Sequence, residues 1–258
     1  MEKLTVGTVY DYIDSFVHFD TQEPWDNSGL LAGSRENTVT GIYCALDVSL
    51  RVIEDAINKG CNLIVSHHPI MFGGRKNLRE DDAEGKMLCA LVRNGISVIS
   101  AHTCFDKAEG GVNDVLASKL GMTNVTGVEG DEDGYLRIGD VEPMTLKQFA
   151  EKVRGLLGDA VRAYGEPDKP VKRVALVGGS GGEFAETCRR AGADAYVTGE
   201  MRYHDSFDLA QADFATLQAG HDSTEKLAVG ALAEKLKTAF SNVPVTESKV
   251  DLFTIHNV

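Results

Sequence analysis

The chain has 258 residues, 43% of them hydrophobic and 25% charged, which allows one large or two small soluble globular domains. Its formal net charge of −13 argues against a protein that grips the nucleic-acid backbone, because such proteins usually have a basic balance or a basic stripe. No apolar run approaches the ~20 residues of a membrane-spanning helix, and the five cysteines form no C-x-x-C pair, so we expect a reduced cytoplasmic protein without membrane segments or disulfides.

The N-terminal segment predicts a helix rather than a signal peptide. Its apolar residues recur at the spacing of a buried helix face, at Leu4, Val9, Ile13, Phe16 and Val17. The loop WDNSG at 25–29 has turn composition. Because this loop carries the only tryptophan, we expect it to pack against something.

The next part of the chain predicts strands that end in polar residues. A strand in YCALDVS (43–49) is followed by a helix over 50–59 and by a short buried strand within 60–66. That strand runs into His67, His68 and Pro69, and proline has no N–H to continue a ladder. Two imidazoles therefore lie at the carboxyl end of a strand, where ligands gather in open α/β sheets. The acidic run REDDAEGK (79–86) is placed to open a further helix.

The second half of the chain repeats this series. Strands are expected in RVALVGGS (173–180), in GADAYVT (192–198) and in FATLQAGH (214–221), matching 43–49, 60–66 and ISVISAH (96–102). Each series closes on a histidine, followed by H-x-x-x-[D/E]-K in both HTCFDK (102–107) and HDSTEK (221–226).

The repeat predicts an α/β fold of two similar, interlinked lobes related by a pseudo-twofold axis, with mainly parallel sheets. The polar, glycine-rich stretch 122–134 is the best boundary between them. We expect a first lobe over 1–126 and a second over 127–223. The final segment, 224–258, with a helix at about 224–240 and the strand VDLFTI, is expected to return to the first lobe.

The residues at these strand ends form a candidate metal site. They are His67, His68, His102, Asp106, His221 and Glu225. Imidazole and carboxylate together suit divalent transition metals. Neighbouring side chains on extended backbone diverge, so His67 and His68 suit two different ions, and each carboxylate could bridge the two.

Simpler interpretations exist for each motif taken alone. His-His-Pro could be a turn, and His-x-x-x-Asp could be a helix cap with an i,i+4 partner. The turn GGSGG (178–182) could hold a phosphate or be merely tight, and it matches neither nucleotide-binding glycine motif. Cys104 could be a nucleophile or a soft ligand, although a packed small residue fits better.

With these residues identified, the chain resembles the NIF-three-like dinuclear metal-centre family, whose members are known as GTP cyclohydrolase I type 2 homologues. The resemblance spans nearly the whole chain, in the family's order: WDNSGLLAG, ALDVS, SHHPIMF, AHTCFD, GVND, GGSGG, DAYVTGE and GHDSTE. It implies the family's fold without the ferredoxin-like insert of longer members.

The resemblance also implies residue roles. The family's metal ligands fall on His67, His68, Asp106, His221 and Glu225, which implies two divalent ions per chain: zinc, manganese, iron, cobalt or nickel. His102 falls beside the site, and His204 falls at a family histidine near the cavity. The chain departs from the family pattern at Cys104-Phe105, at Asp222-Ser223 and at Glu200, which puts substrate contacts in doubt but removes no ligand.

The implied function is a dinuclear metal-dependent hydrolase of a nucleotide-like substrate, with GTP ring opening as the candidate reaction and His102 or His204 as the proton shuttle. Lys107, Lys226 and Arg202 are candidate cations for such a polyanion. The alternative is a metal-handling or regulatory protein without turnover. A ring that encloses nucleic acid is opposed by the net charge. The resemblance implies a homohexamer, a ring of dimers or trimers with the metal sites facing a cavity.

Overall fold

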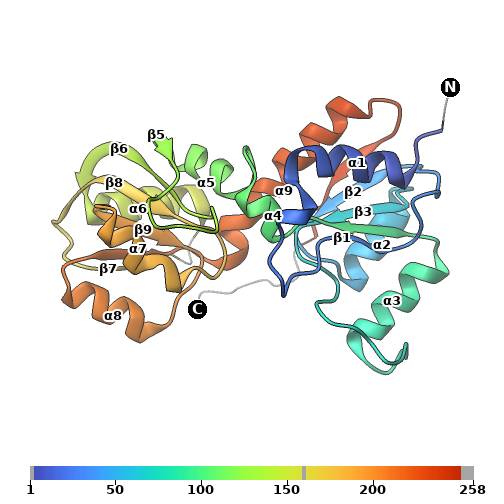
Figure 1. Ribbon diagram of the computed structural model, residues 1–258, viewed down its shortest axis with the longest axis horizontal. Coiled ribbons are helices and arrows are strands. Elements are labelled where there is room, and N and C mark those ends of the chain that lie inside the picture. Colours follow the sequence, from blue (N-terminus) through green and yellow to red (C-terminus); the bar gives the residue numbers. More distant parts are fainter. Residues whose placement is uncertain (1–2, 159–160, 251–258) are drawn as a thin grey trace. The chain divides into compact units, whose positions relative to one another are not determined.

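The computed structural model describes residues 3–158 and 161–250, which form two compact units (Figure 1). The described residues up to Glu109, together with those from Val229 onward, make the first unit, and Gly110–Ala228 make the second. Each unit contains one sheet covered by helices, so the predicted α/β class is confirmed. The lobe boundaries and the pseudo-twofold axis stay predictions.

The first unit is built on a five-stranded sheet of order β1-β4-β3-β2-β11. The strands are β1 (Gly29–Ala32), β2 (Ile42–Ala45), β3 (Leu63–Ser66), β4 (Ser97–Ser100) and β11 (Val245–Glu247). The helices are α1 (Val6–Val17), the 3₁₀ turn η1 (Phe19–Thr21), α2 (Leu50–Asn58), α3 (Ala83–Arg93), α4 (Thr103–Lys107) and most of α9 (His221–Ala239). All neighbouring strands are parallel except β1, which pairs antiparallel with β4.

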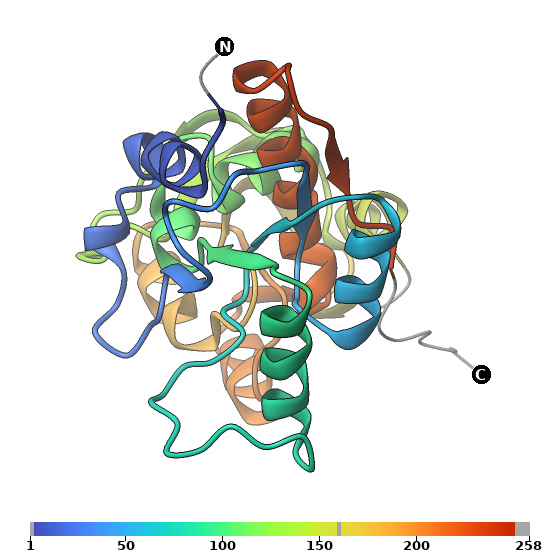
Figure 2. The same ribbon diagram turned by 90° about the vertical axis from the view of Figure 1, so that its right-hand side faces the viewer.

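Strands β2, β3 and β4 are buried along their whole length because helices cover both faces of the sheet. Tyr43, Ile64 and Val98 point to one face and pack in a single cluster with residues of α2 and α3. Figure 2 shows α2 and α3 on that face and α1 on the other. The parallel strands thereby keep their carboxyl ends at one edge.

The second unit is built on a six-stranded sheet of order β5-β6-β8-β9-β10-β7. Its strands are β5 (Thr123–Thr126), β6 (Arg137–Thr145), β7 (Arg162–Tyr164), β8 (Pro170–Leu176), β9 (Ala195–Thr198) and β10 (Ala215–Gln218). Its helices are α5 (Val112–Leu120), α6 (Leu146–Leu157), η2 (Gly182–Phe184), α7 (Ala185–Arg190), α8 (Tyr203–Gln211) and the start of α9.

This sheet also has two covered faces. Val174 and Val197 pack in one cluster with residues of α5 and α6. Ala175 and Tyr196, their neighbours on the same strands, pack in another cluster with residues of α7 and α8. The alternation follows from the two-residue period of a strand.

The two units share one order of connections. In the first, β2, β3 and β4 are parallel neighbours joined through α2 and α3; in the second, β8, β9 and β10 are parallel neighbours joined through α7 and α8. The repeat extends further than the sequence indicated, because β1 and β7 each precede their series and pair antiparallel with its last strand.

The C-terminal return to the first sheet is made by β11, which pairs with β2. The strand expected in VDLFTI lies outside the described residues except for Val250, which is not in a strand. None of the helices within 3–158 and 161–250 is long and apolar enough to cross a membrane.

Candidate metal centre

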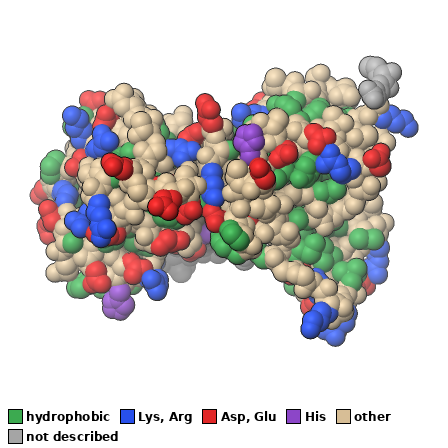
Figure 3. All heavy atoms as spheres, viewed as in Figure 1, with side chains coloured by type: hydrophobic (Ala, Val, Ile, Leu, Met, Phe, Trp, Pro, Cys, Tyr) green, Lys and Arg blue, Asp and Glu red, His purple; other side chains and the backbone are tan. Residues whose placement is uncertain are grey.

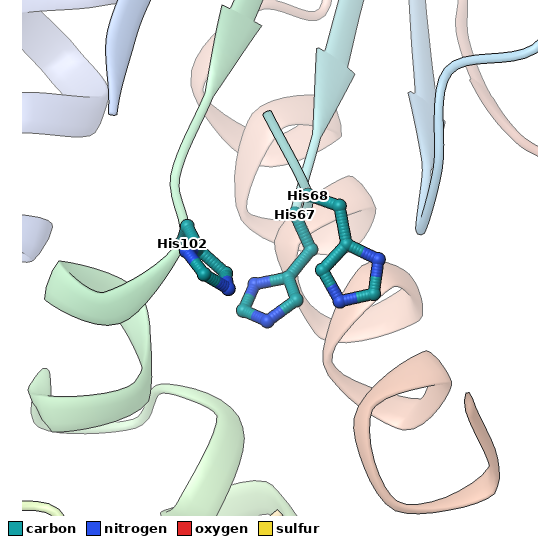
Figure 4. Close-up of side chains that lie close together, drawn as sticks. All are labelled: His67, His68 and His102. Carbon is teal, nitrogen blue, oxygen red and sulfur yellow. The ribbon is translucent and has the colours of Figure 1, made fainter. Parts of the chain in front are cut away.

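His67 and His68 follow directly after the last residue of β3, where the sequence placed them. His67 is buried, and its Nδ1 lies 2.9 Å from the carbonyl oxygen of Ala101. His68 is about one-fifth exposed, and its Nδ1 lies 2.7 Å from Oδ1 of Asp47. The two ring centroids are 5.0 Å apart, and Figure 4 shows the rings side by side. Strand alternation does not separate them, because the chain bends at both residues.

His102 joins this cluster from the end of β4, as the N-cap of α4. Its ring centroid is 5.2 Å from that of His67 and 5.6 Å from that of His68, and one ring nitrogen from each of the three residues lies within 4.8 Å of the others. Figure 4 shows all three imidazoles converging from the ends of β3 and β4.

Asp26, in the WDNSG loop, holds His102 in place. Its Oδ1 lies 2.8 Å from Nδ1 of His102, and its Oδ2 accepts hydrogen bonds from the backbone and the hydroxyl of Thr103. Burial alone would raise the pKa of Asp26, but the hydrogen bonds from His102 and Thr103 outweigh it and hold that pKa well below its usual range. Asp26 is therefore an anionic acceptor at any ordinary pH.

Asp106 lies on α4 with Oδ1 3.6 Å from Nε2 of His67. Two ligand atoms that are each ~2.0–2.1 Å from one ion, at a tetrahedral angle, are roughly 3.3–3.4 Å apart. The His67–Asp106 spacing is close to that value, so this pair fits a shared ion.

The second unit carries the matching pair on α9. His221 is the first residue of the helix, and its Nε2 lies 3.2 Å from Oε2 of Glu225, one turn on. This spacing also fits two ligands of one ion. Nδ1 of His221 lies 2.8 Å from Oε1 of Glu200, which follows β9. The helix begins three residues before the start expected at about 224, and it thereby includes both His221 and Glu225.

The four histidines of the candidate site share one arrangement; they are His67, His68, His102 and His221. Each Nδ1 lies 2.7–2.9 Å from an oxygen that can only accept, a carbonyl at His67 and a carboxylate at the other three. The proton is therefore placed on Nδ1, and the Nε2 lone pair is directed away from that partner. Histidines that bind metals are held in this way by outer-shell acceptors. The donor set of imidazole nitrogen and carboxylate oxygen suits divalent transition metals, so these residues fit such ions.

The sequence did not identify Asp26, Asp47 or Glu200 as part of the site. Asp47 and Glu200 each stand two residues beyond a strand, β2 and β9, at the carboxyl edge that already drew attention to the histidines. That position was the available signal. Nothing in local spacing links these carboxylates to a histidine elsewhere in the chain.

The GGSGG turn packs against the acidic ligand of the second unit. A Cβ on Gly179, whose φ is +64°, would run into the Glu225 carboxylate and come 3.4 Å from Nε2 of His221. The amides of Gly178 and Gly179 donate to Asn113 and Thr224 side chains, and that of Gly181 donates to Thr198. These amides are occupied within the protein, so the turn is a close-packing device rather than a phosphate cradle.

The other candidate residues have ordinary partners. Cys104 is fully buried, and burial raises the pKa of its thiol to about 11, so it is protonated at neutral pH and behaves as a packed residue. His204 is exposed in the first turn of α8, beside the ring of Tyr203. Lys107 binds Glu23, and Arg202 binds Asp205.

The chain is a mixed α/β protein with two sheets, each covered by helices. Histidine and carboxylate side chains at the ends of its parallel strands form candidate metal sites. The family model of Duf34/NIF3 (NGG1p interacting factor 3) matches residues 4–252. The chain belongs to this family, and the resemblance noted in the sequence is confirmed.

Known relatives agree over nearly the full length. A "GTP cyclohydrolase 1 type 2 homolog" of Clostridium acetobutylicum is 34% identical over 257 residues, which cover 95% of this chain and 96% of that protein. The crystal structure of a hypothetical protein of Staphylococcus aureus matches with a TM-score of 0.92 and 28% identity, covering 99% of this chain and 100% of that one. A Bacillus cereus protein related to NIF3, at 24% identity, shares the fold with a TM-score of 0.92 over 100% of both chains.

Proposed function

We propose that this chain is a dinuclear metal-dependent hydrolase of a nucleotide-like substrate, with two divalent ions held by His67, His68, Asp106, His221 and Glu225. The observation that carries the proposal is the shared anchoring of the histidines through Nδ1, which leaves each Nε2 as a lone-pair donor. The ligand-atom spacings of 3.6 Å at His67–Asp106 and 3.2 Å at His221–Glu225 support it.

Bound ions of this kind lower the pKa of water and stabilise a developing oxyanion. The protein's own contribution is to orient the ligands. Asp47 and Glu200 fix the rings of His68 and His221, and Gly179 allows the Glu225 carboxylate to approach the turn.

His102 is the proposed proton shuttle. Its Nδ1 is bonded to Asp26, so its Nε2 is the nitrogen that can accept a proton, and an adjacent carboxylate stabilises the imidazolium that results. His204 remains a second candidate for this role. The proposed finer reaction, by analogy with the names of the relatives, is addition of water to a purine carbon of GTP with ring opening.

The test is an activity screen of purified protein, first stripped of metal and then reloaded with zinc or manganese, against purine nucleotides and phosphoesters. We expect turnover of a purine nucleotide that needs the metal and that falls about 100-fold in His102→Gln, within the range of general acid–base contributions. If the metal-loaded protein turned over none of the substrates, the hydrolase proposal would be wrong and a metal-handling protein would be favoured.

A further inference from the structure

Trp25 and Phe72 are two large aromatic side chains left exposed beside the histidine cluster of the first unit. Trp25 is 61% exposed and Phe72 is 52% exposed. Their ring centroids are 6.3 Å apart, and those of Trp25 and Phe72 lie 5.9 Å and 5.6 Å from that of His102. Figure 3 shows charged side chains of both signs interspersed with hydrophobic ones over one face of the molecule. Trp25 and Phe72 differ from the other exposed hydrophobic side chains because both contact the His102 ring.

The loops that carry these two rings are tied to His102 and to each other. The residue after Trp25 is Asp26, the buried carboxylate that anchors His102. The next residue, Asn27, donates its side-chain N–H to the carbonyl of Met71, 2.8 Å away, and so ties the loop of Trp25 to the loop of Phe72. Loops tied in this way lose less conformational entropy than free loops when the rings they carry bind a ligand.

We propose that Trp25 and Phe72 form an aromatic wall beside His102 that binds the flat heterocycle of the substrate by stacking. The inference rests on the proposed function, because it makes the occupant a substrate of the histidine cluster. Both rings meet the His102 ring at steep angles, 76° and 69°, so neither ring is stacked face to face on the imidazole.

Charge supports stacking as the source of affinity. The chain has a formal net charge of −13, and the nearby cation Lys107 is bound to Glu23. A nucleotide-like polyanion therefore gains little from the general field of the protein. Stacking does not depend on that field, because every heterocyclic base has a π-face, and one base on one aromatic side chain contributes roughly 5- to 100-fold in affinity.

The chain supplies its own reporter, since Trp25 is its only tryptophan. The experiment titrates the zinc-loaded full chain with guanosine, with GTP and with inorganic triphosphate while tryptophan emission is recorded. We expect saturable quenching by guanosine and GTP and none by triphosphate. Absence of quenching by guanosine at millimolar concentration would overturn the proposal.

Variants separate stacking from the other outcomes. Calorimetric affinity for guanosine should fall roughly 5- to 100-fold in Trp25→Ala, less in Phe72→Leu, and stay near that of the parent chain in Trp25→Phe, which keeps a ring. Tyr203→Ala removes another exposed aromatic side chain, on α8, and should leave the calorimetric affinity for guanosine unchanged. Equal affinity of Trp25→Ala and the parent chain refutes the wall.

Two further readouts keep the failures apart. Light scattering reports the mass of Trp25→Ala, and a fall in mass relative to the parent chain would assign the surface to contacts between copies and overturn the proposal. Metal content and turnover are measured on the same samples. Guanosine binding without turnover would support the aromatic wall and contradict the hydrolase. Turnover that is unaffected by Trp25→Ala would contradict the aromatic wall alone.

Discussion

At the scale of single residues, the metal ligands are tested by metal content. His221→Ala and Asp106→Ala each remove one ligand of the proposed set, so elemental analysis should find less zinc per chain than the two ions expected for the parent. His18→Asn is the control, because His18 is an exposed histidine in the left-handed conformation that asparagine tolerates. Two tightly held ions in the double variant would show that the ligands are wrongly assigned.

The carboxylates that orient the histidines are tested separately. Asp47→Ala removes the acceptor at Nδ1 of His68 without touching a proposed ligand. Loss of such an outer partner usually costs about 10- to 100-fold in metal affinity, and we expect that loss in a competition titration against a zinc chelator. Asp47→Asn keeps an acceptor oxygen and should lie in between. Unchanged affinity in Asp47→Ala would mean that His68 needs no orientation.

The candidate ligands could be predicted from the sequence, and their supports could not. Each ligand stands just after a strand or one helical turn further on, so its position follows from local pattern. Asp26 and His102 are far apart in the chain, and their pairing depends on how the loop before β1 lies across the start of α4. A carboxylate that orients a distant imidazole leaves no periodic signature in the sequence.

At the scale of elements, the packing role of the GGSGG turn can be tested with two glycine-to-alanine variants. Gly179→Ala adds a methyl group at φ +64° that meets the Glu225 carboxylate, whereas Gly192→Ala, at φ +81° after α7, adds one into open space. Both should lose about 1–2 kcal/mol of unfolding free energy from the left-handed backbone. Only Gly179→Ala should also lose zinc, as measured by elemental analysis of the folded protein. Equal zinc in the two variants would contradict the packing role of the turn.

Strand β2 carries a pH-dependent contribution to stability. Burial and a hydrogen bond to Asp55 raise the pKa of Tyr43 to about 12. The unfolded chain loses this proton near pH 10, so the stabilisation is complete below pH 10 and is lost as pH rises toward 12. At pH 7 Tyr43→Phe should be less stable by about 1 kcal/mol, and the difference should shrink above pH 10 in urea unfolding.

A difference between Tyr43→Phe and the parent that stayed constant to pH 12 would refute this linkage. The exposed Tyr203→Phe on α8 serves as the control and should follow the parent at every pH.

The paired series of parallel strands could be predicted because each strand is a short apolar run bounded by turn residues. The antiparallel edge strands β1 and β7 could not. They have four and three residues, and neither is fully buried. They pair with the edges that β4 and β10 offer, and their own composition does not mark that pairing.

At the scale of the whole molecule, we predict a homohexamer from the family resemblance. Light scattering of the purified chain, of 27.8 kDa, should give about six times that mass at micromolar concentration. A stable monomer would contradict the hexamer and the enclosed cavity that goes with it. The metal content of a monomer would still be informative, because the ligand pairs His67–Asp106 and His221–Glu225 each lie within one unit.

The place of β11 in the first sheet has a consequence for synthesis. A ribosome releases every strand of the second sheet before Val245–Glu247, the edge that completes the first. The second unit can therefore complete its sheet during translation. Until β11 emerges, the edge of β2 that faces away from β3 has no partner strand among the described residues. An open edge of this kind is a template for mispairing between nascent chains. Within residues 3–158 and 161–250, the last strand to emerge is thus β11, at the edge of the sheet from which His67 and His68 extend. A chain cut short before β11 leaves the ribosome with the edge of β2 unpaired by it.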